Sequence, residues 1–218
     1  MKRKLQIGVI GLGKFGLKVG QVLTDLGHEV MGIDMADSKI REAQHIFSRV
    51  YQLDATHKDA LEQVRVQDLE YVVVSVGDSI SASVMIVMYL KEMGVTNVFA
   101  KAIHKDHEKI LLKIGANEVI IPEYMAATHM ANTIAMPGFV EYLPFDQSMA
   151  LKEFTVSAWK GKTLRDIDVT NTYGIQIIAV KKASIPGYKF IPKASDVLQE
   201  GDCIVALGDM NDLLAVKP

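Results

Sequence analysis

QIGVIGLGKFG, residues 6–16, carries the strongest structural signal in this chain. An apolar run typical of a buried strand leads directly into the pattern G-x-G-x-x-G, where a helical pattern begins. Gly11 permits the tight turn, Gly13 lets backbone amides approach a pyrophosphate, and Gly16 lets the helix pack closely on the strand. The helix N-terminus adds unpaired N–H groups and a partial positive charge. Together these features predict a phosphate-binding loop.

The alternation of strand and helix continues as far as residue 121. The apolar runs are Leu5–Ile10, Glu29–Asp34, Val50–Leu53, Tyr71–Val76, Asn97–Ala100 and Glu118–Ile121. The helical patterns between them are Phe15–Leu26, Ser38–Phe47, Lys58–Val64, Ser81–Met93 and Lys105–Ile114. Strands that alternate with helices pair in parallel, because each crossover needs a helix that covers the sheet. The predicted fold class is therefore α/β, with a Rossmann-type doubly wound parallel sheet.

Beyond residue 121 the chain changes character. Glu123–Met136 has the pattern of a further amphipathic helix, and Pro137, Gly138 and Pro144 then punctuate the sequence. Shorter strand patterns follow, at Glu153–Val156, Ile175–Lys181 and Cys203–Leu207. We therefore expect a nucleotide-binding domain over residues 1–136, a linker over 137–150, and a small α+β module over 151–218.

Composition excludes several classes of protein. The chain has 218 residues, of which 49% are hydrophobic and 23% charged, as in globular proteins. Its net charge of −2 lacks the basic excess of nucleic-acid binding, so we expect no nucleic acid as a partner. No apolar run approaches the ~18 residues of a membrane span, and the N-terminal MKRKLQIGVIG does not read as a signal peptide. The single cysteine, Cys203, excludes an intrachain disulfide and fits the cytoplasm.

Asp34 ends the second predicted strand, eighteen residues after Gly16. A carboxylate at this place can accept hydrogen bonds from both hydroxyls of an adenosine ribose, and it would repel a 2′-phosphate. The alternative is an aspartate that only caps the next helix. We interpret Asp34 as the ribose-binding residue, which favours NAD or an adenine nucleotide over NADP.

Further candidates lie at the carboxyl ends of the other strands. Asp54-Ala55-Thr56 would border the adenine, or make an ordinary turn, and Ser75-Val76-Gly77 would line the next part of the cleft. Lys14 and Lys101 are cations near the expected phosphates, although a solvated lysine is the usual alternative. The predicted cofactor-binding residues are Gly11, Gly13, Lys14, Phe15, Gly16, Asp34, Met35, Lys39, Asp54, Ala55, Thr56, Ser75, Val76, Gly77 and Lys101.

Catalytic chemistry is not evident. A dehydrogenase needs an acid–base group beside the nicotinamide, and the module 151–218 contains no histidine. His104 and His107 could form half of a metal site, but a solvated, charged helix face is the more economical interpretation. We therefore expect no enzyme and favour a nucleotide sensor over an oxidoreductase.

Several longer motifs extend over nearly the whole chain. They are IGLGKFG (10–16), GHEVMGID (27–34), LDAT (53–56), YVVVSVGDSISASV (71–84), KIGANEVIIPE (113–123), GKTLRDIDV (161–169), YGIQIIAVK (173–181) and LQEGDCIVALG (198–208). With them the chain resembles RCK (regulator of K⁺ conductance) proteins, and more narrowly the cytosolic regulatory subunits of Ktr/Trk-type bacterial potassium uptake systems. One Rossmann unit followed by one C-terminal RCK module resembles the Ktr arrangement.

The resemblance implies a gating ring. Such subunits form homodimers through a crossover helix, assemble into rings that are commonly octamers, and dock on an integral membrane K⁺-translocating subunit. The protein would then be cytoplasmic and peripherally associated with the inner face of the cell membrane. ATP or ADP is the implied ligand, and NAD(H) is an alternative. Other functions left open are a small NAD-dependent oxidoreductase and a soluble nucleotide sensor without a membrane partner.

The resemblance also suggests roles for individual residues. Lys14 stands where Ktr subunits often have an arginine that reaches the terminal phosphate; lysine keeps the charge but loses the bidentate fork. Glu123 matches a glutamate that helps to hold Mg²⁺ or another divalent cation at the dimer interface, or it is a helix first-turn carboxylate. Thr170 occupies the position of a basic residue that binds cyclic di-AMP in many Ktr subunits, so the resemblance gives no support for that ligand.

Overall fold

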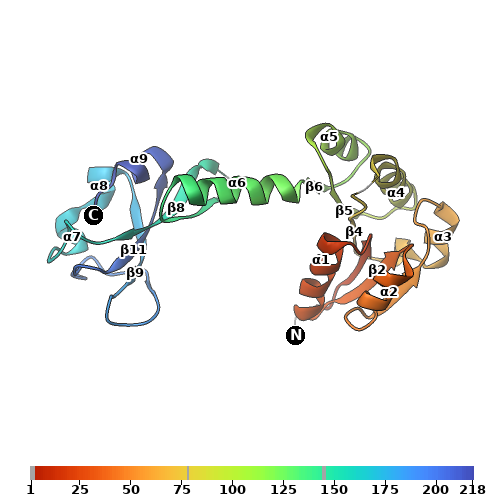
Figure 1. Ribbon diagram of the computed structural model, residues 1–218, viewed down its shortest axis with the longest axis horizontal. Coiled ribbons are helices and arrows are strands. Elements are labelled where there is room, and N and C mark those ends of the chain that lie inside the picture. Colours follow the sequence, from red (N-terminus) through yellow and green to blue (C-terminus); the bar gives the residue numbers. More distant parts are fainter. Residues whose placement is uncertain (1–2, 78, 144–145) are drawn as a thin grey trace. The chain divides into compact units, whose positions relative to one another are not determined.

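The computed structural model describes residues 3–77, 79–143 and 146–218, and it divides into two compact units (Figure 1). The first unit is Met1–Met125 and the second is Ala126–Pro218. Among the described residues, no helix combines the length and apolar character needed to cross a membrane.

The first unit is built on a six-stranded parallel sheet. Its strands are β1 (Gln6–Ile10), β2 (Glu29–Asp34), β3 (Arg49–Gln52), β4 (Tyr71–Val74), β5 (Asn97–Lys101) and β6 (Glu118–Ile120). Their order across the sheet is β3-β2-β1-β4-β5-β6, and every pairing is parallel. This order reverses direction between β1 and β4, where doubly wound folds place their ligands. The predicted Rossmann-type fold is confirmed.

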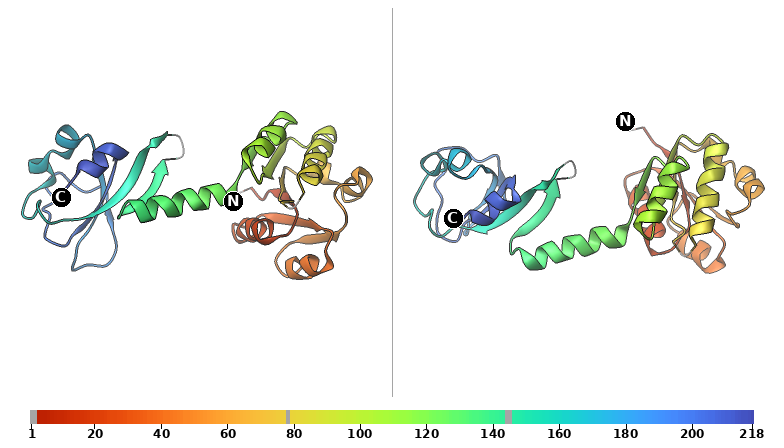
Figure 2. Two further views of the ribbon diagram at one scale, coloured as in Figure 1. Left: turned by 45° about the horizontal axis from the view of Figure 1, so that its top comes forward. Right: turned by 90° about the horizontal axis from the view of Figure 1, so that it is seen from above.

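Helices cover the sheet from both sides (Figures 1 and 2). They are α1 (Lys14–Asp25), α2 (Asp37–Ala43), α3 (Lys58–Gln63), α4 (Ile80–Glu92) and α5 (Lys105–Lys113), with a 3₁₀ turn at Val66–Asp68. Successive strand residues face opposite sides. On β1, Val9 therefore packs in the cluster that includes Phe47, whereas Ile10 belongs to the larger cluster that includes Leu61 of α3, Leu90 of α4 and Leu111 of α5.

The helix α6 (Pro122–Ala135) connects the first unit to the second. Pro122 suits its first turn, since a helix does not need the first N–H groups. No α6 residue is buried, and four large apolar side chains lie exposed on it: Tyr124, Met125, Met130 and Ile134.

The second unit contains a five-stranded antiparallel sheet with the order β10-β9-β11-β8-β7. Its elements are β7 (Phe139–Leu143), β8 (Asp146–Thr155), α7 (Leu164–Ile167), α8 (Val169–Tyr173), β9 (Gln176–Lys181), β10 (Lys189–Phe190), β11 (Cys203–Asp209) and α9 (Met210–Ala215). Its core holds Trp159, Leu198 and Leu213, and the ring of Trp159 lies 5.7 Å from that of Tyr173. The small α+β module is thus a separate core.

The segment predicted as a linker, residues 137–150, differs in the structure. It contains β7 and the first half of β8, which pair with each other and belong to the second sheet. Pro137 and Gly138 form the tight turn between α6 and β7, where Gly138 has a φ of +86°. Pro144 lies outside the described residues. Pro137, which reads as part of a linker in the sequence, therefore lies in the turn that precedes a strand.

Candidate functional site

The glycine loop is tightly built against the end of β4. Gly11 has a φ of +90°, and its N–H donates to the carbonyl of Ile33 at 2.8 Å. A Cβ on Gly16 would lie 2.0 Å from the carbonyl oxygen of Gly11, so only glycine fits there. A Cβ on Gly13 would instead meet no atom within 4 Å. The loop is therefore closed behind Gly16 and open in front of Gly13, as close approach of a ligand requires.

The N-terminus of α1 is suited to an anion. Gly13 caps the helix without a side-chain hydrogen bond, and no acidic residue lies in the first turn. In the described part of the chain, the amides of Lys14, Phe15 and Gly16 have no acceptor. The exposed Lys14 makes no ion pair with any described residue. Unpaired amides next to a lysine at the positive end of a helix dipole are the groups with which a protein can hold an anion such as a phosphate.

Asp34 ties the end of β2 to this loop. Its Oδ2 accepts a hydrogen bond from the Leu12 N–H at 2.7 Å, and its Oδ1 accepts one from the Ala36 N–H at 2.8 Å. Each carboxylate oxygen has two acceptor sites, so one remains on each for the hydroxyls of a ribose. The contact with Leu12 fixes the carboxylate beside the phosphate loop.

The end of β3 forms a local turn. The N–H and hydroxyl of Thr56 both donate to Oδ1 of Asp54, at 2.9 and 2.7 Å. These hydrogen bonds lower the pKa of Asp54, so the carboxylate stays charged. Ala55 is buried beneath them. The geometry is that of the ordinary turn considered as an alternative, and contact of these residues with an adenine stays a prediction.

Two other predicted ligand residues behave as surface groups. The Met35 side chain is exposed. The Lys39 ammonium lies 3.1 Å from a carboxylate oxygen of Glu42, one turn further along α2. Contact of these two residues with a nucleotide stays a prediction.

The ends of β4 and β5 continue the site on the other side of the loop. The Ser75 N–H donates to the carbonyl of Ile10 at 2.7 Å, and Ser75 is buried. Val76 is half-buried beside it. A Cβ on Gly77 would lie 3.5 Å from Nζ of Lys101. The backbone at Gly77 therefore lies next to the Lys101 ammonium group.

Lys101 forms an ion pair with Glu123. Its Nζ lies 2.7 Å from Oε1 of Glu123, with the lysine side chain 16% exposed and the glutamate 61% exposed. This hydrogen bond lowers the pKa of Glu123. Lys101 therefore lies between Gly77 and the first turn of α6, whereas Lys14 remains open to solvent.

A divalent cation does not fit the described residues of a single chain. They contain no group of three His, Cys, Asp or Glu side chains that could surround a metal ion. Glu123 provides one carboxylate, and Lys101 already neutralises it. In the second unit, the hydroxyl of Thr170 lies 3.2 Å from Oε1 of Gln176, a local contact.

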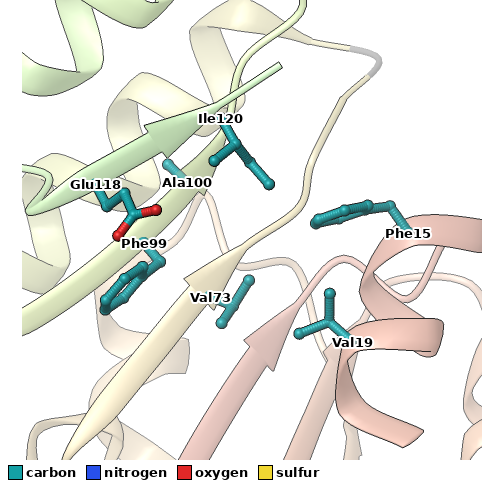
Figure 3. Close-up of a pocket in the computed structure, with 7 residues that line it drawn as sticks. All are labelled: Phe15, Val19, Val73, Phe99, Ala100, Glu118 and Ile120. Carbon is teal, nitrogen blue, oxygen red and sulfur yellow. The ribbon is translucent and has the colours of Figure 1, made fainter. Parts of the chain in front are cut away.

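The side chain of Phe15 lines an apolar hollow beside the sheet, whereas its backbone amide belongs to the glycine loop. The hollow has a volume of about 140 Å³ and opens on the α1 side of β4, β5 and β6 (Figure 3). Its lining residues are Phe15, Val19, Val73, Phe99, Ala100, Glu118 and Ile120.

The interpretation of His107 as a solvated residue was wrong. His107 is 1% exposed, and its Nε2 lies 2.8 Å from the hydroxyl oxygen of Ser83 on α4. The Ile103 N–H lies 3.4 Å from Nδ1, and the Ser83 hydroxyl donates to the carbonyl of Ile80. Nε2 therefore carries the proton. Burial lowers the pKa of His107, so the neutral ring joins α4 to α5.

Sequence reasoning missed two contacts of the site. They are the hydrogen bond from Leu12 to Asp34 and the ion pair between Lys101 and Glu123. The first could have been expected, because β1 and β2 end side by side at the same edge. The second depends on where the first turn of α6 lies, which the sequence does not specify.

The sequence matches two known domain families and several curated proteins. The TrkA-N domain family matches residues 7–122, and the TrkA-C domain family matches residues 151–218. The chain is 33% identical to the Ktr system potassium uptake protein C of Bacillus subtilis, over 96% of this chain and 95% of that protein. It is 31% identical to the Ktr system potassium uptake protein A of Vibrio alginolyticus, over 95% and 94% of the two chains.

A solved structure shares the fold. The GsuK channel bound to NAD superposes with a TM-score of 0.57 at 18% identity, over 98% of this chain and 38% of the GsuK chain. The chain thus spans less than half the length of that structural relative. The likeness shows the fold, and both domain matches agree with it.

Proposed function

The chain belongs to the family of TrkA-N and TrkA-C domain proteins, and on that premise we propose that it is a nucleotide-binding regulatory subunit of a potassium transport system. The Ktr potassium uptake proteins match it over nearly their full length, which supports this role for the whole chain. As a regulatory subunit it would be cytoplasmic and held at the inner face of the membrane by an integral membrane K⁺-translocating partner.

One observation carries the proposal. The amides of Lys14, Phe15 and Gly16 lack an acceptor among the described residues, directly beside the carboxylate of Asp34 that Leu12 holds in place. A diphosphate would accept from these amides while the ribose hydroxyls donate to Asp34. This arrangement fits ATP, ADP and NAD(H) alike, because all three share an adenosine and at least two phosphates.

The proposed mechanism is a change of shape driven by ligand charge. ATP brings more negative charge to the loop than ADP, and Lys14 is the open cation that can respond to it. A ligand shifts a conformational equilibrium only through its differential affinity for the two states. A shift from 1:99 to 99:1 needs about 5.5 kcal/mol, which several sites in one ring could share. We propose no catalytic step.

Association between chains completes the proposal. The sheet face beside Phe15 carries an open apolar hollow, and α6 exposes Met125, Met130 and Ile134. Large apolar side chains in such numbers on one helix are typical of a surface that a partner covers. We propose a homodimer in which α6 of one chain covers apolar surface of the other, and a ring, such as an octamer, built from these dimers.

A divalent cation at Glu123 stays a prediction, since further ligands would have to come from the nucleotide or a second chain.

Two experiments test the proposed function. Mass spectrometry of the purified protein identifies the nucleotide that accompanies it, and we expect an adenine nucleotide. Calorimetric titration with ATP and ADP should then give different affinities, with different scattering profiles for the two complexes. Equal affinity and identical profiles would contradict the mechanism.

The rival functions have their own tests. Hydride transfer in a turnover screen with nicotinamide cofactors would favour the oxidoreductase. Repeated purification without any integral membrane subunit, from cells that produce both proteins, would favour a sensor without a membrane partner.

A further inference from the structure

Lys101 lies between Gly77 and the carboxylate of Glu123. It is the last residue of β5, and its side chain is mostly buried. Its ammonium group lies beside Gly77, which follows β4 at the ligand edge of the sheet. The same ammonium lies 2.7 Å from the Glu123 carboxylate in the first turn of α6.

A continuous path joins this lysine to the glycine loop. A Cβ on Gly16 would lie 3.1 Å from Cβ of Ser75, so the loop and the end of β4 are in contact. Gly77 is two residues further along the same segment and borders Lys101. A phosphate chain that extends from the amides of α1 along this edge would therefore approach Lys101.

We propose that the phosphates of a bound nucleotide and Glu123 compete for Lys101, so that nucleotide binding loosens the attachment of α6 at its first turn. The inference rests on the proposed function, because it needs a nucleotide in the site. It deepens that function by naming the residue pair that would link the ligand to α6.

Charge explains why one lysine cannot serve both partners equally. A nucleoside diphosphate brings at least two negative charges, and Lys101 contributes a single positive one. With Glu123 in place, the ligand must either displace the carboxylate or bind beside it, and both cost free energy. Removal of the Glu123 charge should therefore tighten nucleotide binding.

A divalent cation bound to Glu123 would have the opposite effect on nucleotide affinity. If the carboxylate held a metal ion that also contacted the phosphates, its removal would weaken binding. The direction of the change in affinity therefore separates the two interpretations.

The test is calorimetric titration of the full-length protein with ADP and with adenosine, in a chelating buffer and again with Mg²⁺. The variants are Glu123→Gln, Lys101→Gln and the double substitution. Glu92→Gln is the matched control, because it breaks another Lys–Glu ion pair of similar length, between Lys58 on α3 and Glu92 on α4 at 2.8 Å.

We expect Glu123→Gln to bind ADP about two- to fivefold more tightly than the unaltered protein in the chelating buffer, as partly exposed ion pairs imply. Lys101→Gln should bind ADP several-fold more weakly, and the effect of Glu123→Gln should disappear in the double variant. Adenosine, which has no phosphate, should bind equally to all of them, and Glu92→Gln should change nothing.

Unchanged or weaker binding of ADP by Glu123→Gln would overturn the competition while leaving the nucleotide site intact. Failure of the unaltered protein to bind either ligand would overturn the proposed function as well. Glu123 is mostly exposed, so its substitution does not threaten the fold.

Discussion

At the scale of single residues, Gly13 and Gly16 have opposite reasons to be glycine. Gly16 is enclosed, since a Cβ would collide with the carbonyl oxygen of Gly11. Gly13 is open, with a φ of −65° that any residue can adopt. One glycine is thus required by the fold, and the other is required only if a ligand approaches the loop as proposed.

This difference predicts two separable effects. Gly16→Ala should lower the free energy of unfolding by about 1–3 kcal/mol, because the clash is with backbone that cannot move aside. The gain of up to about 1 kcal/mol in helix propensity is too small to offset it. Urea denaturation measures the change, and an unaltered midpoint would contradict the packing argument.

Gly13→Ala should leave the unfolding free energy within about 0.5 kcal/mol of the original. Its Cβ would instead occupy the space that a pyrophosphate needs, so we expect adenine-nucleotide affinity to fall at least tenfold, or about 1.4 kcal/mol. Calorimetry on the same samples provides the comparison. Normal binding by this variant would place the phosphates elsewhere.

Asp34 should matter to every adenosine ligand. Asp34→Ala removes the acceptors proposed for the ribose, and hydrogen bonds to a charged group contribute about 1.5–3 kcal/mol each. We expect affinities for ATP, ADP and NADH all to fall by about tenfold or more, while the domain still folds. Asp37→Ala, which removes the partner of Arg41 on the exposed side of α2, is the control and should bind normally.

At the scale of helices, the α4–α5 pair depends on a buried neutral histidine. His107 uses both ring nitrogens, toward Ser83 on one side and the Ile103 N–H on the other. A proton on Nδ1 would confront that N–H and bring an uncompensated charge into the interior. Besides burial, electrostatic repulsion from the exposed His104, whose ring lies 6.1 Å away, also lowers the pKa of His107.

The protein should therefore lose stability in mild acid. The pKa of His107 is lowered on folding from its ordinary value near 6.5, so below that pH the unfolded chain binds the additional proton. As the pH falls from 6.5 to 5, the unfolding free energy of the unaltered protein should decrease more steeply than that of His107→Gln. The difference in slope should be up to about 1.4 kcal/mol per pH unit. Chemical denaturation at several pH values measures the slopes.

His104→Asn is a suitable control for this experiment. The His104 ring accepts the His107 N–H at the start of α5, and asparagine can serve as an equivalent N-cap. This variant should retain most of the acid sensitivity of the unaltered protein, because burial is the main cause of the lowered His107 pKa. Identical slopes in the unaltered protein and His107→Gln would show that His107 does not titrate with unfolding.

At the scale of the whole molecule, the exposed apolar surface of α6 predicts association. Met130→Glu with Ile134→Glu places two charges on that surface, and charged groups are costly to bury in an interface. We expect the oligomer to become smaller in light scattering after size-exclusion chromatography. Leu26→Glu, at an equally exposed leucine next to α1, should leave the mass unchanged.

Local sequence patterns predicted most of the fold. The six strands of the first sheet begin and end within two residues of their predicted bounds, because each is a short apolar run bordered by glycine or polar residues. The error over residues 137–150 has a different origin. Pairing of β7 with β8 is a contact between strands, and nothing in the local composition distinguishes it from a linker.

In the candidate site, too, local features could be predicted from the sequence, whereas contacts between distant elements could not. The glycine loop and Asp34 follow from spacing, since both lie at ends of adjacent strands. The partner of Lys101 and the burial of His107 depend on how α6 begins and on how α4 packs against α5. Such contacts are properties of the assembled chain and were beyond prediction from the sequence.

The hydrogen bond from Leu12 to Asp34 has a consequence for timing. It holds the carboxylate beside the glycine loop through the chain's own backbone, so an arriving nucleotide would meet an acceptor that needs little further ordering, and capture would be limited mainly by diffusion and orientation. The time that the protein needs to respond to a change in nucleotide concentration would then be set by the dissociation rate of the nucleotide already bound.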